Sequence, residues 1–279
     1  MEIFKYDFMI KAFLVGGLIA IIAPCIGIFI LLKRLSMIGH SLSHTSLAGV
    51  AVGLIAGINP ILGATAFSVI AALSIEKIRK SFTNYSEIAI AIITSAGIGL
   101  AGVLSGFIKS SATFNNFLFG SIVAISNFEV ILVSVLSVII LLTIIVLYKP
   151  LFYIAFDEES SRLAGIPVSS INFLFTLLTA IAISISSRTV GALIISSLMV
   201  IPVSTAMQVG KSFANTLVLS IIFSLISTFS GLFISFYTNL KPGGTIVLVG
   251  VILLILTIFY KNILKRYCSK LLALMSREC

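Results

Sequence analysis

The sequence predicts an all-α polytopic membrane protein, and three observations support this fold class. Of its 279 residues, 59% are hydrophobic and only 10% are charged, whereas a soluble domain carries about 25% charged residues. The mean hydropathy is +1.24. The apolar residues also gather into runs of about 20 residues, the length of helix that crosses about 30 Å of hydrocarbon. An ordinary soluble enzyme is therefore excluded.

The apolar runs predict eight or nine transmembrane helices. They cover residues 12–32, 37–58, 60–75, 88–108, 127–148, 171–187, 189–209, 213–237 and 244–260. The number stays open because Asn59-Pro60 shortens the second and third runs, and Arg188 barely separates the sixth from the seventh. Either pair could be one broken helix. The first run is too long for the apolar core of a signal peptide, so we expect it to be the first span.

The charge balance indicates membrane topology and no nucleic-acid partner. The net charge is +9, but the basic residues stand singly or in short clusters between the apolar runs. With nine spans and the N-terminus outside, the positive-inside rule is obeyed, because thirteen basic residues lie inside and five outside. The inner set is Lys33, Arg34, Lys77, Arg79, Lys80, Lys149, Arg162, Lys211, Lys261, Lys265, Arg266, Lys270 and Arg277, and the outer set is Lys5, Lys11, Lys109, Arg188 and Lys241. Residues 1–279 thus read as a single transmembrane domain with a short basic cytoplasmic tail at 261–279.

The longest polar connection, residues 148–170, is expected to carry a short helix on the inner surface. Asp157 is a good N-cap, and Gly165 followed by Pro167 supplies a stop, so the helix should cover about 157–165. One interpretation is a solvated connector. The other is a docking element for a cytoplasmic partner, presenting Asp157, Glu158, Glu159, Arg162 and Gly165.

The second apolar run contains the chain's two histidines, His40 and His44. Their i, i+4 spacing places them on one helix face. Counted from Arg34 at the predicted inner boundary, His44 lies about 15 Å deeper, roughly half of the hydrocarbon thickness. Ionisable side chains at such depth are costly and are therefore functional candidates.

Two interpretations of the histidines remain open. Neutral imidazole is a good ligand for Zn, Cu, Ni and Fe, and two imidazoles on one face can bind a single ion. Alternatively, the pair makes hydrogen bonds between helices, helped by the nearby hydroxyl groups of Ser36, Ser41, Ser43 and Thr45. Two ligands form a weak site, which suits a conduction path because the ion must leave again.

Three glycines follow on the same run at four-residue spacing, Gly49, Gly53 and Gly57. Such a row lets another helix approach closely. Gly49 lies about 140° around the helix from His44, so the two features face different ways. We interpret the glycines as a helix-packing face.

The sequence shows no catalytic machinery of its own. Gly210-Lys211-Ser212 is similar to the end of a phosphate-binding loop, but Thr205 stands where that loop needs glycine. Glu129 is the only acidic residue within an apolar run, at its rim, and Cys25, Cys268 and Cys279 are too scattered for a metal cluster or a disulfide framework. Active transport would therefore need an ATPase from another subunit.

Several segments together resemble the permease subunits of the bacterial ABC importers for zinc, manganese and iron. The resembling segments are residues 34–53, 119–121, 156–167, 190–202 and 242–245. His44 matches the family's histidine in the first of these segments, whereas His40 stands where the family usually has aspartate. In that family these two positions are thought to coordinate the ion in transit.

The resemblance implies the fold of an ABC importer permease of the metal-chelate or vitamin B12 type, in the bacterial cytoplasmic membrane. It also implies the partners: a second copy of the permease, two cytoplasmic ATPase subunits on the coupling loops, and an extracytoplasmic metal-binding protein. Membrane lipid is expected around the chain, and nucleic acid is not expected as a partner. No cofactor is expected to be bound by the chain itself, since the divalent metal is its substrate.

The resulting hypothesis is a permease for a divalent metal, with His40 and His44 as transit ligands and residues 157–165 as the coupling helix. Zinc is the first choice and manganese or iron the next, because an imidazole in place of a carboxylate favours the softer ion. The alternatives are a self-sufficient secondary carrier, which would need more ionisable groups in the bundle, and, ranked last, an intramembrane hydrolase.

Overall fold

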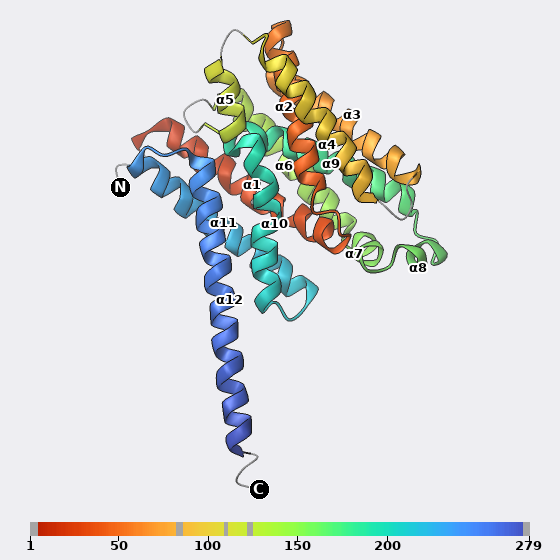
Figure 1. Ribbon diagram of the computed structural model, residues 1–279, viewed down its shortest axis with the longest axis vertical. Helices are drawn as coiled ribbons and strands as arrows, with labels where there is room; N and C mark the ends of the chain where they lie inside the picture. Colours follow the sequence, from red (N-terminus) through yellow and green to blue (C-terminus); the bar gives the residue numbers. More distant parts are fainter. Residues whose placement is uncertain (1–4, 82–85, 109–110, 122–124, 276–279) are drawn as a thin grey trace.

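The computed structural model describes the chain except for residues 1–4, 82–85, 109–110, 122–124 and 276–279. Side chains are also left undescribed at 80–81, 86, 111–113, 188–189, 193 and 264–275. In the described part, every regular element is a helix (Figure 1). The helices are α1 (Asp7–Leu32), α2 (Ile38–Ala56), α3 (Pro60–Ser81), α4 (Ser86–Ser105), α5 (Ser111–Phe119), α6 (Asn127–Val146), α7 (Tyr148–Phe156), α8 (Glu158–Leu163), α9 (Val168–Ser186), the π-helical segment η2 (Ser187–Gly191), α10 (Ala192–Val209), α11 (Phe213–Thr238) and α12 (Pro242–Met275).

Eight of the described helices are long and apolar enough to cross a membrane: α1, α2, α3, α4, α6, α9, α11 and α12. The apolar α10 is shorter. The all-helical, multi-pass fold predicted from the sequence is confirmed, and α10 is the element that left the number between eight and nine.

The second and third apolar runs form two separate helices that pack against each other. The chain leaves α2 through Gly57, whose φ of +69° is left-handed. It enters α3 at Pro60, and the side chain of Asn59 accepts a hydrogen bond from the backbone N–H of Ile61 at 2.9 Å. Glycine at a helix end and proline in the first turn explain this tight reversal.

The sixth and seventh runs are also two helices, joined through η2. Gly191 ends η2 with a φ of +101°, which only glycine adopts easily, and the chain changes direction there. The side chain of Arg188, at the predicted boundary, lies outside the described residues. The sequence therefore marked the break correctly, although a π-helical segment takes the place of a loop.

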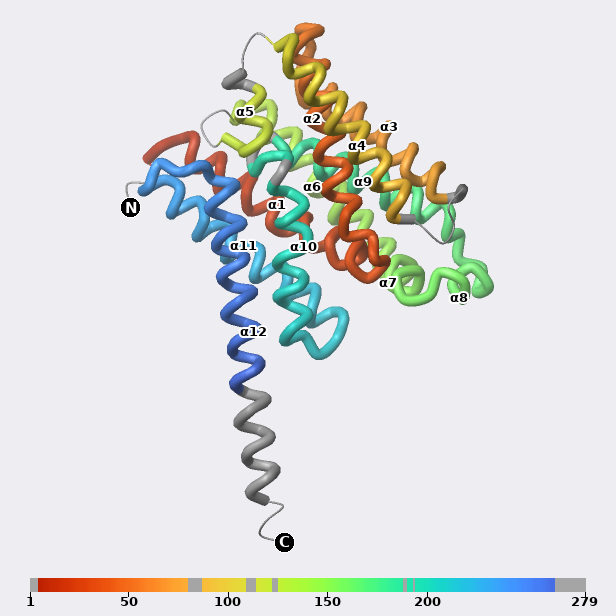
Figure 2. The backbone as a smooth tube through the Cα atoms, in the orientation of Figure 1, coloured from red at the N-terminus to blue at the C-terminus, as the bar shows by residue number. Residues whose placement is uncertain are grey.

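Burial separates central from peripheral helices. In α1 and α2, 72% of the span is buried inside the chain, against 17% in α4 and 22% in α12. The tube in Figure 2 shows α1 crossing the middle of the bundle, where Phe29, Ile19, Ile22 and Ile26 are fully buried. The peripheral helices expose their apolar side chains, as expected for surfaces that face lipid.

Two features of the fold differ from the expectation. The connection 148–170 holds two helices, α7 and α8, because α6 ends at Val146 and the largely apolar stretch after it forms a separate short helix with Leu151 and Ile154 buried. The last helix also does not end near residue 260 but continues to Met275 through the predicted tail. Side chains of the tail beyond Ile263 lie outside the described residues.

Three segments that are distant in the sequence meet at the end of the bundle that carries α5. A Cβ added to Gly191 would lie 2.6 Å from the carbonyl carbon of Phe119, and one added to Gly243 would lie 2.2 Å from the carbonyl oxygen of Val190. The Nζ of Lys241 lies 4.2 Å from the centroid of the Phe119 ring. These glycines allow backbones to touch, so the segments around 119–121, 190–202 and 242–245 form one packed junction.

Candidate metal transit site and coupling helix

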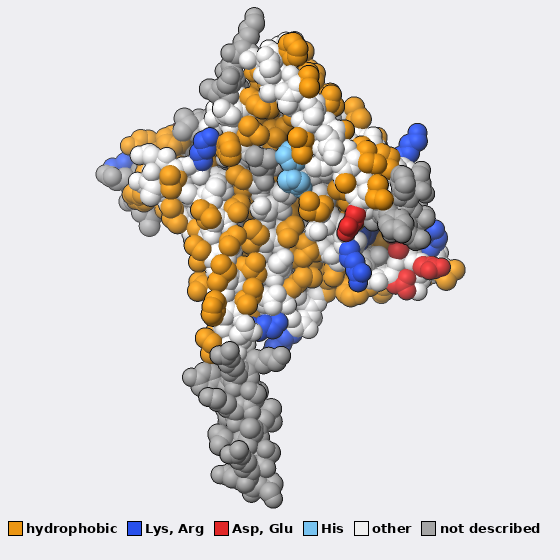
Figure 3. Space-filling view, in the orientation of Figure 1, with side chains coloured by type: hydrophobic (Ala, Val, Ile, Leu, Met, Phe, Trp, Pro, Cys, Tyr) orange, Lys and Arg blue, Asp and Glu red, His pale blue; other side chains and the backbone are white. Residues whose placement is uncertain are grey.

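His40 and His44 lie in the first two turns of α2 and point toward each other. Their Nε2 atoms are 3.1 Å apart, within hydrogen-bond distance, and both side chains are half-buried. In the space-filling view the two imidazoles are visible at the surface of one face of the molecule, among apolar side chains (Figure 3). The structure therefore brings the predicted pair together at a surface of the single chain.

The separation of the two nitrogens fits a shared metal ion. Two nitrogens 3.1 Å apart can both lie about 2.05 Å from one ion, with an angle of about 100° at the metal, between the tetrahedral and octahedral values. No group of three or more histidine, cysteine, aspartate or glutamate side chains suited to a metal occurs in the described part of the chain. One chain thus offers two ligands at this place.

The neighbouring hydroxyl groups do not bind the imidazoles. Ser43 donates to the carbonyl of Gly39 at 2.7 Å, and Thr45 donates to the carbonyl of Leu42 at 3.0 Å, both within α2. Ser41 donates across to the carbonyl of Ile90 on α4 at 3.3 Å. Among described residues, the hydrogen-bond partner of each imidazole is the other imidazole, so the alternative of hydroxyl-assisted bonds between helices is not the arrangement found.

Close backbone contacts hold the other faces of α2. A Cβ on Gly49 would lie 2.2 Å from the carbonyl oxygen of Gly63, and one on Gly53 would lie 2.8 Å from the Cα of Pro60, both on α3. On α4, a Cβ on Gly97 would lie 2.7 Å from the Cγ2 of Thr45. With α3 and α4 packed against it, α2 has little freedom to rotate, which fixes where the imidazoles point.

The third glycine of the row, Gly57, has a different role from the expected one. It follows the last residue of α2 in a left-handed conformation, and a Cβ there would meet nothing within 4 Å. Gly57 therefore ends the helix and does not pack against another one. The physical reason is that the chain turns back directly after Gly57. Helix α3 begins at Pro60, opposite Gly53, and so does not extend over Gly57.

The helix that carries the histidines begins later than expected. Residues 33–37 form turns, so α2 begins at Ile38 and His44 lies six residues into it, about 9 Å along the helix axis and not the 15 Å of a helix that starts at Arg34. The helix nevertheless starts within the bundle, because a Cβ on Gly39 would lie 3.5 Å from the Cβ of Ser196 on α10.

The segment predicted to be a coupling helix is capped at both ends as expected, although α8 itself covers only 158–163. Asp157 accepts hydrogen bonds from the backbone N–H groups of Glu159 and Ser160 at 3.1 and 3.0 Å. The hydrogen bond from the Ser160 side chain, followed by its backbone bond, lowers the pKa of the Asp157 carboxyl. The cap therefore keeps its charge at neutral pH.

The far end of α8 is a full Schellman motif. The N–H of Gly165 donates to the carbonyl of Arg162, and the N–H of Ile166 donates to the carbonyl of Ser161, both at 3.1 Å. Gly165 has a φ of +83°, which explains why glycine follows the helix. Arg162 and Glu158 pair along the exposed face at 3.4 Å.

Two exposed apolar residues that the sequence pattern did not single out lie at the two ends of the charged run 157–162, one closing α7 and the other closing α8. Phe156 is 63% exposed and Leu163 is 86% exposed. Large apolar side chains on a polar loop are typical anchors of a protein contact. Their position at the two ends of the uninterrupted polar run 157–162 is the signal that could have identified them.

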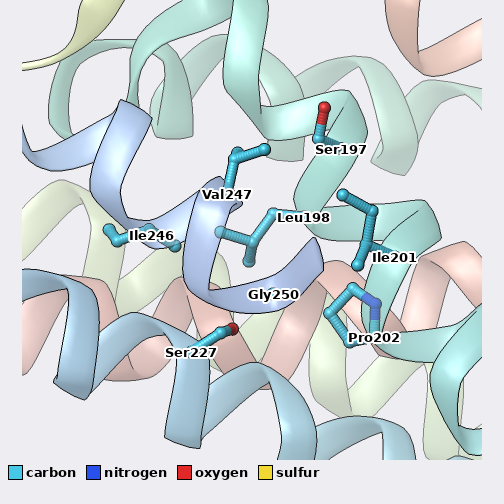
Figure 4. Close-up of a pocket in the computed structure, with 8 residues that line it drawn as sticks. All are labelled: Ser197, Leu198, Ile201, Pro202, Ser227, Ile246, Val247 and Gly250. Atoms are coloured by element: carbon cyan, nitrogen blue, oxygen red, sulfur yellow. The ribbon is translucent and has the colours of Figure 1, made fainter. Parts of the chain in front are cut away.

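A small, half-open space between α10, α11 and α12 offers no good ligand to a metal. Its lining consists of Ser197, Leu198, Ile201, Pro202, Ser227, Ile246, Val247 and Gly250 (Figure 4). Pro202 lacks an N–H inside α10, and Ser227 already donates to the carbonyl of Ser224 at 2.9 Å. The lining is apolar in the main, so the imidazole pair remains the candidate ion site.

Comparisons with known proteins point to one family of transporters. The ABC 3 transport family matches residues 5–261. The chain is 37% identical over 256 residues to the "Probable metal transport system membrane protein" of Treponema pallidum, covering 91% of this chain and 96% of that protein. It is 29% identical to the "Manganese transport system membrane protein MntC" of Listeria monocytogenes, covering 92% and 91%.

A zinc protein and a solved structure are also similar. The "High-affinity zinc uptake system membrane protein ZnuB" of Haemophilus influenzae is 27% identical, with 92% of this chain and 99% of that protein covered. A chain of PsaBC from Streptococcus pneumoniae in complex with Fab superimposes with a TM-score of 0.82 at 30% identity, covering 91% of both chains. The similarity in sequence and in fold thus extends over nearly the whole chain.

Proposed function

The chain belongs to the ABC 3 transport family, and from this premise we propose that it is the permease subunit of an ATP-driven importer for a divalent metal ion. The multi-pass helical fold fits a pathway across the cytoplasmic membrane. Relatives named for manganese and for zinc support the class of substrate. The ATPase would be a separate subunit, since the sequence offers no nucleotide-binding motif of its own.

The observation that carries this proposal is the His40–His44 pair on α2. Its two nitrogens are 3.1 Å apart and half-buried, and an imidazole at such a place binds late transition metals well. The ion would be held by weak, incomplete coordination and could therefore be released. His40, in the position of the family's usual aspartate, favours zinc over manganese in this chain.

A second copy of the permease would complete the coordination. The imidazoles lie on one face of the chain (Figure 3), so a twofold axis beside this face would bring two pairs together. Four nitrogens would suit tetrahedral Zn²⁺. The ion pathway would then run between the two copies.

The α8 segment would dock on the ATPase. Asp157, Glu159 and Arg162 are exposed there, and the apolar Phe156 and Leu163 flank them. A charged face with apolar anchors resembles the composition of protein interfaces. An extracytoplasmic metal-binding protein would deliver the ion at the opposite end, where α5 lies.

Uptake of labelled zinc and manganese tests the proposal in bacterial cells that lack their own importers and express this chain with its ATPase and binding protein. We expect uptake by the wild type to need all three components. His44→Ala should abolish uptake while the ATPase still copurifies. Thr257→Ala, on the lipid-facing α12, is the control variant. Normal uptake by a His40→Ala, His44→Ala double variant would overturn the ligand role, and uptake without the ATPase would favour a secondary carrier.

A further inference from the structure

Lys33, directly after α1, is a partly buried cation that plays no part in the proposed metal site. Its Nζ donates to the side-chain oxygen of Asn172 on α9 and lies 5.6 Å from the centroid of the Phe175 ring. Burial lowers the pKa of Lys33 to about 8, an effect to which Arg79 adds, while Glu158 on α8 and Glu76 on α3 oppose it. Lys33 is thus desolvated, and held by contacts to other helices.

Asn172 is joined firmly to the coupling helix. After the Schellman motif at Gly165, the N–H of Val168 donates to the carbonyl of Ile166 at 2.7 Å, and the N–H of Ile171 donates to the carbonyl of Pro167 at 3.1 Å. Val168 and Ile171 are buried in the core. Every residue between α8 and Asn172 therefore lies within two positions of a residue that is buried or held by one of these hydrogen bonds. A movement of α8 should for this reason displace Asn172.

Lys33 is joined just as firmly to the helix of the histidines. The N–H of Leu35 donates to the carbonyl of Ile30 at 2.9 Å, which closes α1, and the N–H of Ile38 donates to the carbonyl of Leu35 at 2.9 Å, which opens α2. Leu35 and Ile38 are buried and line the same small cavity as Lys33 and Asn172. His40 is the third residue of α2.

Resting on the proposed function, we propose that the Lys33–Asn172 contact transmits displacement of the ATPase-docked α8 to the start of α2, and so to the two imidazoles. Lys33 and Asn172 are then positioning residues and touch no metal. The contact joins two hydrogen-bonded units, one comprising α8 and the beginning of α9, the other comprising the end of α1 and the beginning of α2. Without it, ATP hydrolysis and ion release would proceed with less dependence on each other.

The test measures metal ions transported per ATP hydrolysed, in proteoliposomes that hold the permease, its ATPase and the binding protein. Lys33→Met and Asn172→Leu keep the size of each side chain and remove the hydrogen bond. We expect each variant to lower the number of ions transported per ATP about fivefold, the size of effect typical of residues that couple two sites, while ATP hydrolysis continues. The double variant should be no worse than either single one. Asn172→Asp, which offers Lys33 a carboxylate, should keep the ratio, and Lys211→Met removes an exposed lysine as a control.

The outcomes separate the two proposals. If the wild type hydrolyses ATP without moving metal, the proposed function fails. If the wild type is coupled and both single variants keep its ratio, only the role of the Lys33–Asn172 contact is overturned. A parallel loss of assembled complex, hydrolysis and transport, with an unchanged ratio, would also overturn it, since that pattern indicates a purely structural contact.

Discussion

Gly49 on α2 and Gly63 on α3 lie against each other backbone to backbone. A Cβ on Gly49 would be 2.2 Å from the carbonyl oxygen of Gly63, and a Cβ on Gly63 would be 2.3 Å from the carbonyl oxygen of Gly49. The contact is reciprocal, so neither helix can take a side chain here without moving the other. Because α2 carries both imidazoles, this contact also fixes the position of the candidate ion site.

Gly49→Ala and Gly63→Ala should each destabilise the fold by about 1–3 kcal/mol, the usual cost of overpacking a closed contact. Gly99→Ala on α4 is the matched control, since a Cβ there meets nothing within 4 Å. It should be neutral or slightly stabilising, because alanine favours the helix. Thermal unfolding in detergent measures the difference. Equal melting temperatures for all three variants would contradict the close contact.

Gly165→Val should weaken docking of the ATPase. The residue has a φ of +83° with nothing near a Cβ, so the effect is one of backbone conformation alone, about 1–2 kcal/mol for a side chain that resists the left-handed region. Gly165→Asn is the control, because asparagine tolerates this region. We expect affinity for the ATPase to fall about tenfold in the valine variant and less in the asparagine variant. Equal affinities at equal expression would argue against a docked α8.

Because of Lys33, the free energy of unfolding should rise with pH in the alkaline range. The pKa of Lys33 is about 8 in the folded chain and 10.5 ordinarily, so between these values the unfolded state binds more protons and the free energy of unfolding rises with pH. Below about pH 8 the cost of the partly buried charge is constant. The melting temperature of the wild type relative to Lys33→Met should therefore rise by about 3 °C or more from pH 8 to pH 10. A difference that stays flat, as expected for the control Lys211→Met, would show that Lys33 is hydrated.

Much of the fold followed from the sequence because lipid imposes simple rules. The apolar runs, the caps at Asp157 and Gly165, and the i, i+4 spacing of the histidines are local patterns with direct physical meaning. They predicted most of the spans, the capped helix after α7 and the juxtaposed imidazoles. The role of Gly49 in packing could also be read from its spacing.

What the sequence left out depends on contacts between distant segments. Gly97 carries no local signal that it will meet α2 beside His44, and nothing near Lys33 indicates Asn172 as its partner. Gly57 fits the packing row by spacing, yet the position of the turn decides its role. Such pairings follow from how the helices cross, which periodicity does not encode.

His40→Asp should shift the preference of the transit site from zinc toward manganese. In the wild type the two ligands are imidazole nitrogens 3.1 Å apart, which suit zinc, and a carboxylate at residue 40 would pair one hard oxygen with one nitrogen, a set that manganese accepts better. We expect uptake to persist and the ratio of zinc to manganese uptake to fall about tenfold, equivalent to about 1.4 kcal/mol. The variant should also lose less activity in acid, because a protonated imidazole cannot ligate and only one imidazole remains.

His40→Asn separates charge from size, since its amide oxygen is a weaker ligand, and it should transport both ions poorly. Competition between labelled zinc and manganese in cells without their own importers gives the ratio; the same ratio in the wild type and in His40→Asp would mean that the delivery protein, and not residue 40, selects the ion.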